Sequence, residues 1–200
     1  MNPFNQPPFS FPPMLKPLLP LLAFFFAASL PVAAADTAEA KPGLRVGEKA
    51  PGFTLKSAAG DDLALSAALR QGNVALIFVR SADWCPFCRR QLQDLQKDLK
   101  AITASGVQVI AVSYDSPAIN AAAVAKLGLT YPLLSDPGSK VIDAYGIRNL
   151  EATGRAAGVP HPTVFILDRQ GTIRARLMRD HYRDRPESAE IMAAAQAVRG

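Results

Sequence analysis

Apolar and polar residues follow different periods along the chain, and each period predicts an element of secondary structure. Residues alternate between apolar and polar on both sides of Ala58–Asp61, which predicts a β-hairpin with Gly60 in its turn. Asn73–Arg80 and Val107–Ser113 are continuous apolar runs of the kind found in strands that are buried on both faces. These two runs are therefore expected at the centre of a sheet.

Two further segments carry helical signals. After Pro86 the apolar residues recur at steps of four and three, which predicts a helix that ends near Ser105. The stripe of this helix consists of Cys88, Leu92, Leu95, Leu99 and Ile102. Residues 116–128 predict a second helix, with Ser116 as its N-cap and Pro117 at its first position.

The C-terminal part predicts a short amphipathic piece at Val141–Tyr145, two strands joined by a turn at Arg169–Gly171, and a closing helix that begins near Pro186. Strands and helices thus alternate along the chain, which is typical of an α/β domain. We expect a sheet with parallel strand–helix–strand units and helices on its faces. In such sheets the reactive site lies beyond the carboxyl ends of the strands.

The N-terminus resembles a secretory signal. Lys16 is its only charge, the apolar run Leu18–Leu30 follows, and the small residues Ala33–Ala35 offer a cleavage site. We expect residues 1–35 to be removed and the protein to be exported, periplasmic or secreted, with the bacterial periplasm as its compartment. The alternative is an uncleaved membrane anchor, but prolines break the run, which is shorter than the roughly twenty apolar residues that span a bilayer. The true start is either Met1 or Met14.

Residues 36–44 are small and polar and predict a flexible leader, which leaves 45–200 as a single domain. The formal net charge of the whole chain is +5, which is only mildly basic. Six arginines fall between Arg169 and Arg185, but aspartates lie among them, so this stretch predicts a solvated face and no nucleic-acid site. No glycine-rich phosphate loop follows a strand, and we expect no bound cofactor.

The only two cysteines, Cys85 and Cys88, lie where the first apolar run meets the first helix. Unpaired N–H groups and the dipole at a helix start favour a thiolate, and Pro86 suits the first helical position. Cys88 lies one turn later on the apolar stripe. The pair therefore predicts an exposed attacking cysteine and a sheltered resolving one. Arg80 ends the preceding strand and could bring a cation to the Cys85 thiolate. The alternative is that Arg80 points away and pairs with Asp83 or solvent, since a one-residue change of strand register moves the side chain to the other face.

Other interpretations of the cysteine pair stay open. A purely structural disulfide would close a very short loop and so remove little entropy from the unfolded chain. A zinc site needs more ligands, and the only histidines are His161 and His181. Copper binding by the cysteines and a histidine, or a non-enzymatic redox-sensing module, are further alternatives. We expect no bound metal.

Three stretches carry a family resemblance: "VGEKAPGFTL", "ALIFVRSADWCPFCRRQL" and "GVPHPTVFILDRQGTI". From about Val46 to Gly200 the chain resembles the peroxiredoxin superfamily, in particular its alkyl hydroperoxide reductase/thiol-specific antioxidant branch. The resemblance implies a thioredoxin-like fold, a central mixed sheet flanked by helices with an N-terminal hairpin extension. It implies that Cys85 is the reactive cysteine and Cys88 the second one, which form a redox-active disulfide. It also implies supporting roles for Trp84, Pro86 and a cis Pro162 packed beside the sulfurs.

Two positions depart from the family pattern. Ala82 stands where peroxiredoxins carry a threonine or serine, and Pro160–Thr163 replaces the region of their arginine. Two activities therefore stay open. The first is a peroxidase in which Cys85 attacks a peroxide and Cys88 closes a disulfide. The second is a thiol–disulfide oxidoreductase acting on protein disulfides. The expected partners are a peroxide or protein-disulfide substrate and a thiol reductant, either thioredoxin-like or of low molecular weight. Nucleic acid is not expected, and a membrane only through an uncleaved signal.

Overall fold

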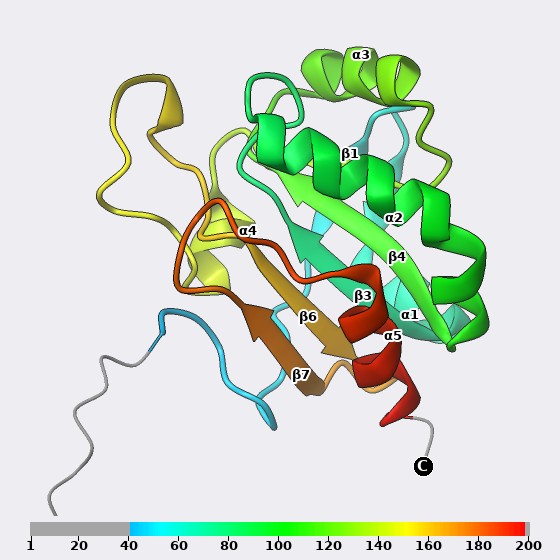
Figure 1. Cartoon of the computed structure of the whole chain (residues 1–200). Helices are drawn as coiled ribbons and strands as arrows, with labels where there is room; N and C mark the ends of the chain where they lie inside the picture. Colours follow the sequence, from blue (N-terminus) through cyan, green and yellow to red (C-terminus); the bar gives the residue numbers. More distant parts are fainter. Residues whose placement is uncertain (1–40, 199–200) are drawn as a thin grey trace, which may run out of the picture. The chain divides into compact units, whose positions relative to one another are not determined.

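The computed structural model describes residues 41–198, and the expected signal and most of the expected leader lie outside these residues. The described chain forms one mixed sheet with helices against it (Figure 1). Its strands are β1 (Thr54–Ser57), β2 (Asp62–Ala64), β3 (Asn73–Phe78), β4 (Val107–Ser113), β5 (Leu133–Ser135), β6 (Thr163–Leu167) and β7 (Ile173–Met178). Its helices are α1 (Leu65–Gln71), α2 (Pro86–Ala104), α3 (Pro117–Leu127), α4 (Lys140–Ala144), a 3-10 turn at Gly154–Ala156, and α5 (Ser188–Gln196).

The strand order across the sheet is β2-β1-β5-β4-β3-β6-β7. β3, β4 and β5 run parallel, whereas β1, β2, β6 and β7 join through antiparallel pairs. The expected mixed sheet with an N-terminal hairpin is thus confirmed. β3 lies between β4 and β6, so the loop that follows its carboxyl end leaves from the interior of the sheet and not from an edge strand.

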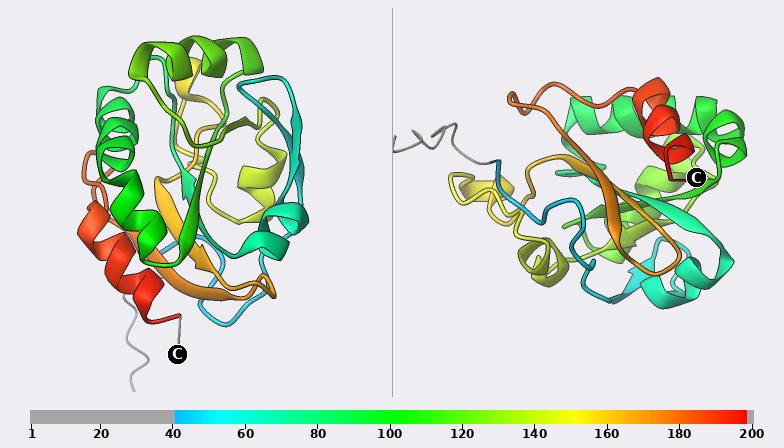
Figure 2. Two further views of the ribbon diagram at one scale, coloured as in Figure 1. Left: turned by 90° about the vertical axis from the view of Figure 1, so that its right-hand side faces the viewer. Right: turned by 90° about the horizontal axis from the view of Figure 1, so that it is seen from below.

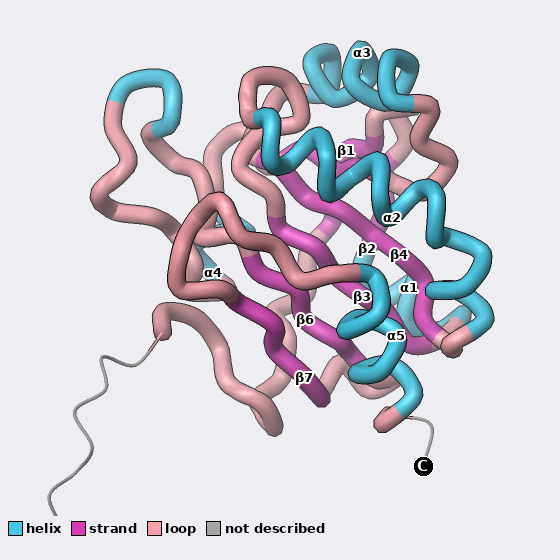
Figure 3. Tube along the Cα trace, in the orientation of Figure 1, coloured by secondary structure: helices cyan, strands magenta, loops and turns pink. Residues whose placement is uncertain are grey.

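β3 is buried on both faces, as its continuous apolar run predicts. Ala75, Ile77 and Val79 pack into one cluster, and Val74, Leu76 and Phe78 into another. α2 and α5 contribute to the first cluster, and α1 and α4 to the second. Figures 2 and 3 show the resulting three layers, with α2 and α5 on one side of the sheet and α1 and α4 on the other.

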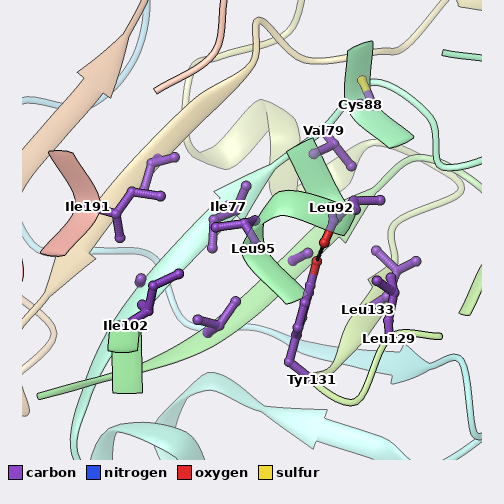
Figure 4. Close-up of a cluster of buried hydrophobic side chains, with 14 of the residues drawn as sticks. Ile77, Val79, Cys88, Leu92, Leu95, Ile102, Leu129, Tyr131, Leu133 and Ile191 are labelled. Atoms are coloured by element: carbon purple, nitrogen blue, oxygen red, sulfur yellow. Dashed lines mark hydrogen bonds between the residues drawn. The ribbon is translucent and has the colours of Figure 1, made fainter. Parts of the chain in front are cut away.

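The cluster beneath α2 includes both cysteines. Leu92, Leu95 and Ile102 of α2 contact β3 and α5, and Cys88 lies at one end of the same cluster (Figure 4). The hydroxyl of Tyr131 donates a hydrogen bond of 2.8 Å to the carbonyl of Leu92 within it. Cys88 is therefore anchored in the core on a helix whose position is fixed by close packing.

Three local features differ from expectation. The end of the expected flexible leader is bonded to the domain, because the Leu44 N–H donates to Tyr145 and Arg176 donates to carbonyls of residues 41–44. Helix α1 and strand β5 were not predicted, since both are short and follow other apolar segments directly.

Among residues 41–198, no helix combines the length and apolar character that crossing a membrane requires.

Candidate active site

The loop after β3 delivers the first cysteine to the start of α2. Cys85 is the N-cap of this helix and has extended backbone angles. Its sulfur accepts a hydrogen bond of 3.4 Å from the backbone N–H of Cys88. Pro86 occupies the first helical position, as expected, where its missing N–H leaves no bond unmade. The sequence therefore places a sulfur where a helix offers free N–H groups.

The two sulfurs lie 2.7 Å apart and share a hydrogen bond, and both cysteines are free thiols. Cys85 is only 1% exposed and Cys88 is 0% exposed. The expected division into an exposed attacker and a sheltered resolver is wrong in its first half. Both sulfurs are covered, because the loop before α2 and the segment before α5 close over them.

Arg185 supplies the cation at the sulfurs. Its Nη2 lies 3.3 Å from the Cys88 sulfur and 3.9 Å from the Cys85 sulfur. Its Nη1 donates to the backbone carbonyls of Tyr182 and Asp184, which fixes the guanidinium group. Arg185 lies between β7 and α5, in the stretch that the sequence predicted to be a solvated face. That prediction is wrong for Arg185, which is half-buried.

The cysteine pair ionises as one unit. The hydrogen bond to Cys85 lowers the pKa of Cys88 to about 6, against the effect of burial and with the help of Arg185. The same hydrogen bond, together with burial, raises the pKa of Cys85. The pair thus holds one negative charge and one shared proton near neutral pH. The lowered pKa was expected at Cys85, whereas in this arrangement it falls on Cys88, which lies nearer to Arg185.

Arg80 does not take the position expected of it. Its guanidinium carbon lies 5.1 Å from the centre of the Trp84 ring and 4.9 Å from that of Tyr182. Its Nε is buried and has no hydrogen-bond partner among the described residues. The guanidinium carbon of Arg155 also lies over the Trp84 ring, 5.0 Å from its centre. Arg80 therefore packs the loop beside the cysteines, and Arg185 lies at the sulfurs in its place.

A buried carboxylate, Asp115, holds the loop, and no sequence motif marks it as a site residue. Asp115 is 3% exposed and accepts hydrogen bonds of 3.0 Å from the Ser81 hydroxyl and 2.7 Å from the Ala82 N–H. Burial raises the pKa of Asp115. Asp115 follows β4 directly, at the same sheet edge as the loop. Its place after a predicted buried strand was the signal that could have found it.

Pro162 is trans, and the expectation of a cis bond is wrong, since residues 41–198 contain no cis peptide bond. The chain passes through Pro162 directly into the extended strand β6, which the ordinary trans bond permits. Pro162 is buried. His161 is half-buried; its N–H donates to the Ile147 carbonyl at 2.7 Å, and burial lowers its side-chain pKa. In the described part, no three His, Cys, Asp or Glu side chains form a group able to hold a metal ion.

Comparison with known proteins places this geometry in a family. The model of the AhpC/TSA family matches residues 46–176. The "Putative peroxiredoxin Rv2521" of Mycobacterium tuberculosis is 33% identical over 131 residues, which are 65% of this chain and 82% of the relative. The thiol-disulfide oxidoreductase ResA of Halalkalibacterium halodurans is 32% identical over 64% of this chain and 66% of its own length.

The fold is also shared with solved structures. The crystal structure of the peroxidoxin BcpB from Mycobacterium tuberculosis aligns with a TM-score of 0.69 at 22% identity, and covers 78% of this chain and 99% of that one. This supports the thioredoxin-like arrangement of the sheet and helices. The chain belongs to the AhpC/TSA family and is a thiol-based oxidoreductase of the peroxiredoxin-like type.

Proposed function

We propose that this protein reduces peroxides through a disulfide between Cys85 and Cys88. The observation that carries the proposal is the contact of two sulfurs, 2.7 Å apart, at a helix start beside the Arg185 guanidinium. Both cysteines are almost wholly buried. A small peroxide needs less opening of the structure to reach a buried sulfur than a disulfide within a folded protein does. Burial therefore favours the peroxidase over the alternative.

The reaction balances without a bound cofactor. The Cys85 thiolate attacks one oxygen of the peroxide, the O–O bond breaks, and the other oxygen leaves as an alcohol or water after taking up a proton. Cys85 is then a sulfenic acid. The Cys88 sulfur attacks it, water leaves, and a disulfide forms. Two electrons from an external thiol, either thioredoxin-like or of low molecular weight, return both cysteines to the reduced state.

The shared proton allows Cys85 to react although Cys88 has the lower pKa of the pair. A proton in a hydrogen bond between two sulfurs can move from one to the other, and it leaves Cys85 ionised when it moves to Cys88. The backbone N–H of Cys88 then stabilises the Cys85 thiolate. Cys85 is the attacker in this proposal because its sulfur, and not that of Cys88, caps the start of α2.

We assign to Arg185 the role of the hydroxyl and arginine side chains that peroxiredoxins carry and that this chain lacks. Ala82 has no hydroxyl, and its N–H already binds Asp115. A guanidinium group carries several donors in one plane, so it can contact a thiolate and a peroxide oxygen together. In the peroxide complex, Arg185 would orient the O–O bond and stabilise the negative charge on the leaving oxygen.

Reduction of protein disulfides is the second candidate. The direct contact of the two sulfurs favours it, because a mixed disulfide at Cys85 would be resolved by Cys88 without movement of the backbone. The similarity to ResA agrees with this activity.

We also propose that the protein acts outside the cytoplasm, and this proposal rests on the signal-like pattern of residues 1–35 alone.

One steady-state comparison tests both candidates. Consumption of hydrogen peroxide is measured with dithiothreitol as the donor, and reduction of insulin is measured with the same enzyme and the same donor. Peroxide turnover well above the rate with dithiothreitol alone supports the proposal. Insulin reduction without peroxide turnover would replace it with the second candidate, and the Cys85→Ser variant gives the background of both assays.

A further inference from the structure

A cleft of about 750 Å³ lies beside the cysteine pair, and the reaction described above does not use it. One wall is a stripe of α2 and the other is formed by residues 183–189 and Met192 of α5. Arg185 lines this cleft and also contacts both sulfurs. Neither cysteine lines the cleft itself, and Arg185 connects the cleft to the reactive centre. α2 and α5 lie side by side in Figure 2 and pack against one another.

The length of the cleft exceeds what a peroxide needs. Its α2 wall consists of Phe87, Arg90, Gln91, Asp94, Leu95 and Asp98. From Phe87 to Asp98 the helix rises by about 16 Å at 1.5 Å per residue. An extended polypeptide advances about 3.3 Å per residue, so roughly five residues match this wall.

The wall of the cleft offers one unpaired donor and one unpaired acceptor. Gln91 is 6% exposed, and its Oε1 has no hydrogen-bond partner in the described part of the protein. The Nε of Arg185 is likewise buried without a partner there. Buried polar groups are nearly always bonded, so such a pair calls for a ligand. A peptide main chain carries one N–H donor and one C=O acceptor in each residue and can satisfy both.

The charges of the cleft also favour a neutral main chain. Arg90 pairs with Asp94 at 3.8 Å, and Lys97 pairs with the same carboxylate at 2.9 Å. The Glu187 side chain is engaged in the capping box of α5. Three arginines and four carboxylates line the cleft, so charges of both signs are mixed along it. A strongly acidic or basic ligand finds no matching field here, whereas Phe87 and Met192 offer apolar contact to side chains of a polypeptide.

We propose that the cleft between α2 and the segment before α5 binds the extended main chain of a cysteine-bearing polypeptide, the thiol donor of the Cys85–Cys88 pair. This inference rests on the proposed redox function of the pair. The thiolate of the donor attacks the Cys85 sulfur of the disulfide, the bond to Cys88 breaks, and Cys88 leaves as a thiolate beside Arg185. A second thiol of the donor then breaks the mixed disulfide, so that the donor is oxidised and both cysteines are reduced.

The test compares thiols that differ only in the chain attached to them. The oxidised protein is mixed with N-acetylcysteine amide, or with blocked alanine peptides of three, five and seven residues that contain one central cysteine. Loss of the Cys85–Cys88 disulfide is followed by mass spectrometry of acid-quenched samples. The rate constant should rise with length and reach roughly tenfold above the amide, the effect of one to two hydrogen bonds.

Two glutamine variants give the matched comparison. Gln91→Leu removes the amide from the cleft at similar size, and Gln93→Leu makes the same change at an exposed position of α2. Gln91→Leu should lose the preference for long peptides, and Gln93→Leu should keep it. Equal rates for the amide and the longest peptide in the wild type, or a preference retained in Gln91→Leu, would overturn the proposal.

Dithiothreitol separates this inference from the proposed function. It is too small to use the cleft, so all three proteins should be reduced by it at the same rate. If peroxide treatment forms no Cys85–Cys88 disulfide that dithiothreitol can reduce, the proposed function itself fails. If that disulfide forms and is reduced normally while peptide length has no effect, only the role of the cleft fails.

Discussion

The guanidinium group of Arg185 lies 3.3 Å from the Cys88 sulfur, although 97 positions separate the two residues in the sequence. The fold closes this distance because β7 runs antiparallel to β6 and the segment that follows it brings Arg185 to the cysteines at the start of α2. The cation at the sulfurs thus comes from an element that is remote in sequence from the cysteine motif.

Replacing Arg185 should destabilise the thiolate form of the cysteine pair and so raise its pKa. In Arg185→Met the first pKa of the cysteine pair should rise by about one unit, which corresponds to about 1.4 kcal/mol of lost thiolate stabilisation. Titration by thiolate absorbance near 240 nm measures the shift. Arg80→Met serves as the control, because Arg80 packs on Trp84 and Tyr182 and makes no hydrogen bond to the sulfurs in the described structure. A larger shift in Arg80→Met than in Arg185→Met would reverse the roles given to the two arginines.

The pH dependence of peroxide reduction should report the lowered pKa of the pair. The deprotonated pair is the reactive form, so a lowered pKa extends activity to lower pH. With the pKa of Cys88 lowered to about 6, kcat/KM should rise through pH 6 and level off near pH 7. At pH 5 it should be roughly tenfold below the plateau. A profile that keeps climbing towards pH 9 would mean that the thiols behave as ordinary cysteines.

Replacing each cysteine by serine should stop the reaction at a different step. Cys85→Ser should abolish turnover, because it removes the sulfur that caps the helix and attacks the peroxide. Cys88→Ser should still consume one equivalent of peroxide and stop at a sulfenic acid on Cys85, which dimedone traps for mass spectrometry. Native circular dichroism in both variants excludes unfolding as the cause. An exchange of these phenotypes would make Cys88 the attacker, which is the sulfur with the lower pKa here.

The loop that carries Cys85 should depend on Asp115. Asp115→Ala leaves the Ala82 N–H and the Ser81 hydroxyl buried without their acceptor, at a cost of about 2–3 kcal/mol of unfolding free energy. Asp115→Asn retains one oxygen for the Ala82 N–H and should cost less. Urea denaturation measures both. Asp98→Ala, at an exposed position of α2, should stay within about 0.5 kcal/mol of wild type. Equal stability of Asp115→Ala and wild type would remove the loop-anchoring role.

Much of the fold could be predicted because local pattern and tertiary position agree. The apolar stripe from Cys88 to Ile102 predicts α2, and the run at Asn73–Arg80 predicts the central strand β3. Both elements are long enough for their period to be read. β5 has only three residues, and its pairing with β4 comes from the sheet and not from any local alternation.

The site could be predicted only where it is local in sequence. Cys85, Cys88 and Pro86 lie in one helix start, so spacing alone brings them together. Arg185 could not be found in this way, because its neighbouring aspartates gave it the pattern of a solvated face. The side chain of Arg80 was misplaced for a different reason. The end of a strand fixes where the backbone leaves the sheet, while packing against Trp84 and Tyr182 decides where the guanidinium group lies.

Trp84 gives the protein an optical property of its own. It is the only tryptophan of the chain and directly precedes Cys85. Its ring lies near the guanidinium groups of Arg80 and Arg155, and its indole N–H donates to the Tyr114 hydroxyl at 3.0 Å. Indole emission responds to nearby charges and to the oxidation state of adjacent sulfur. The whole fluorescence of this chain at tryptophan wavelengths therefore comes from a single point beside the reactive pair, and each oxidation and reduction can be timed in the unlabelled protein.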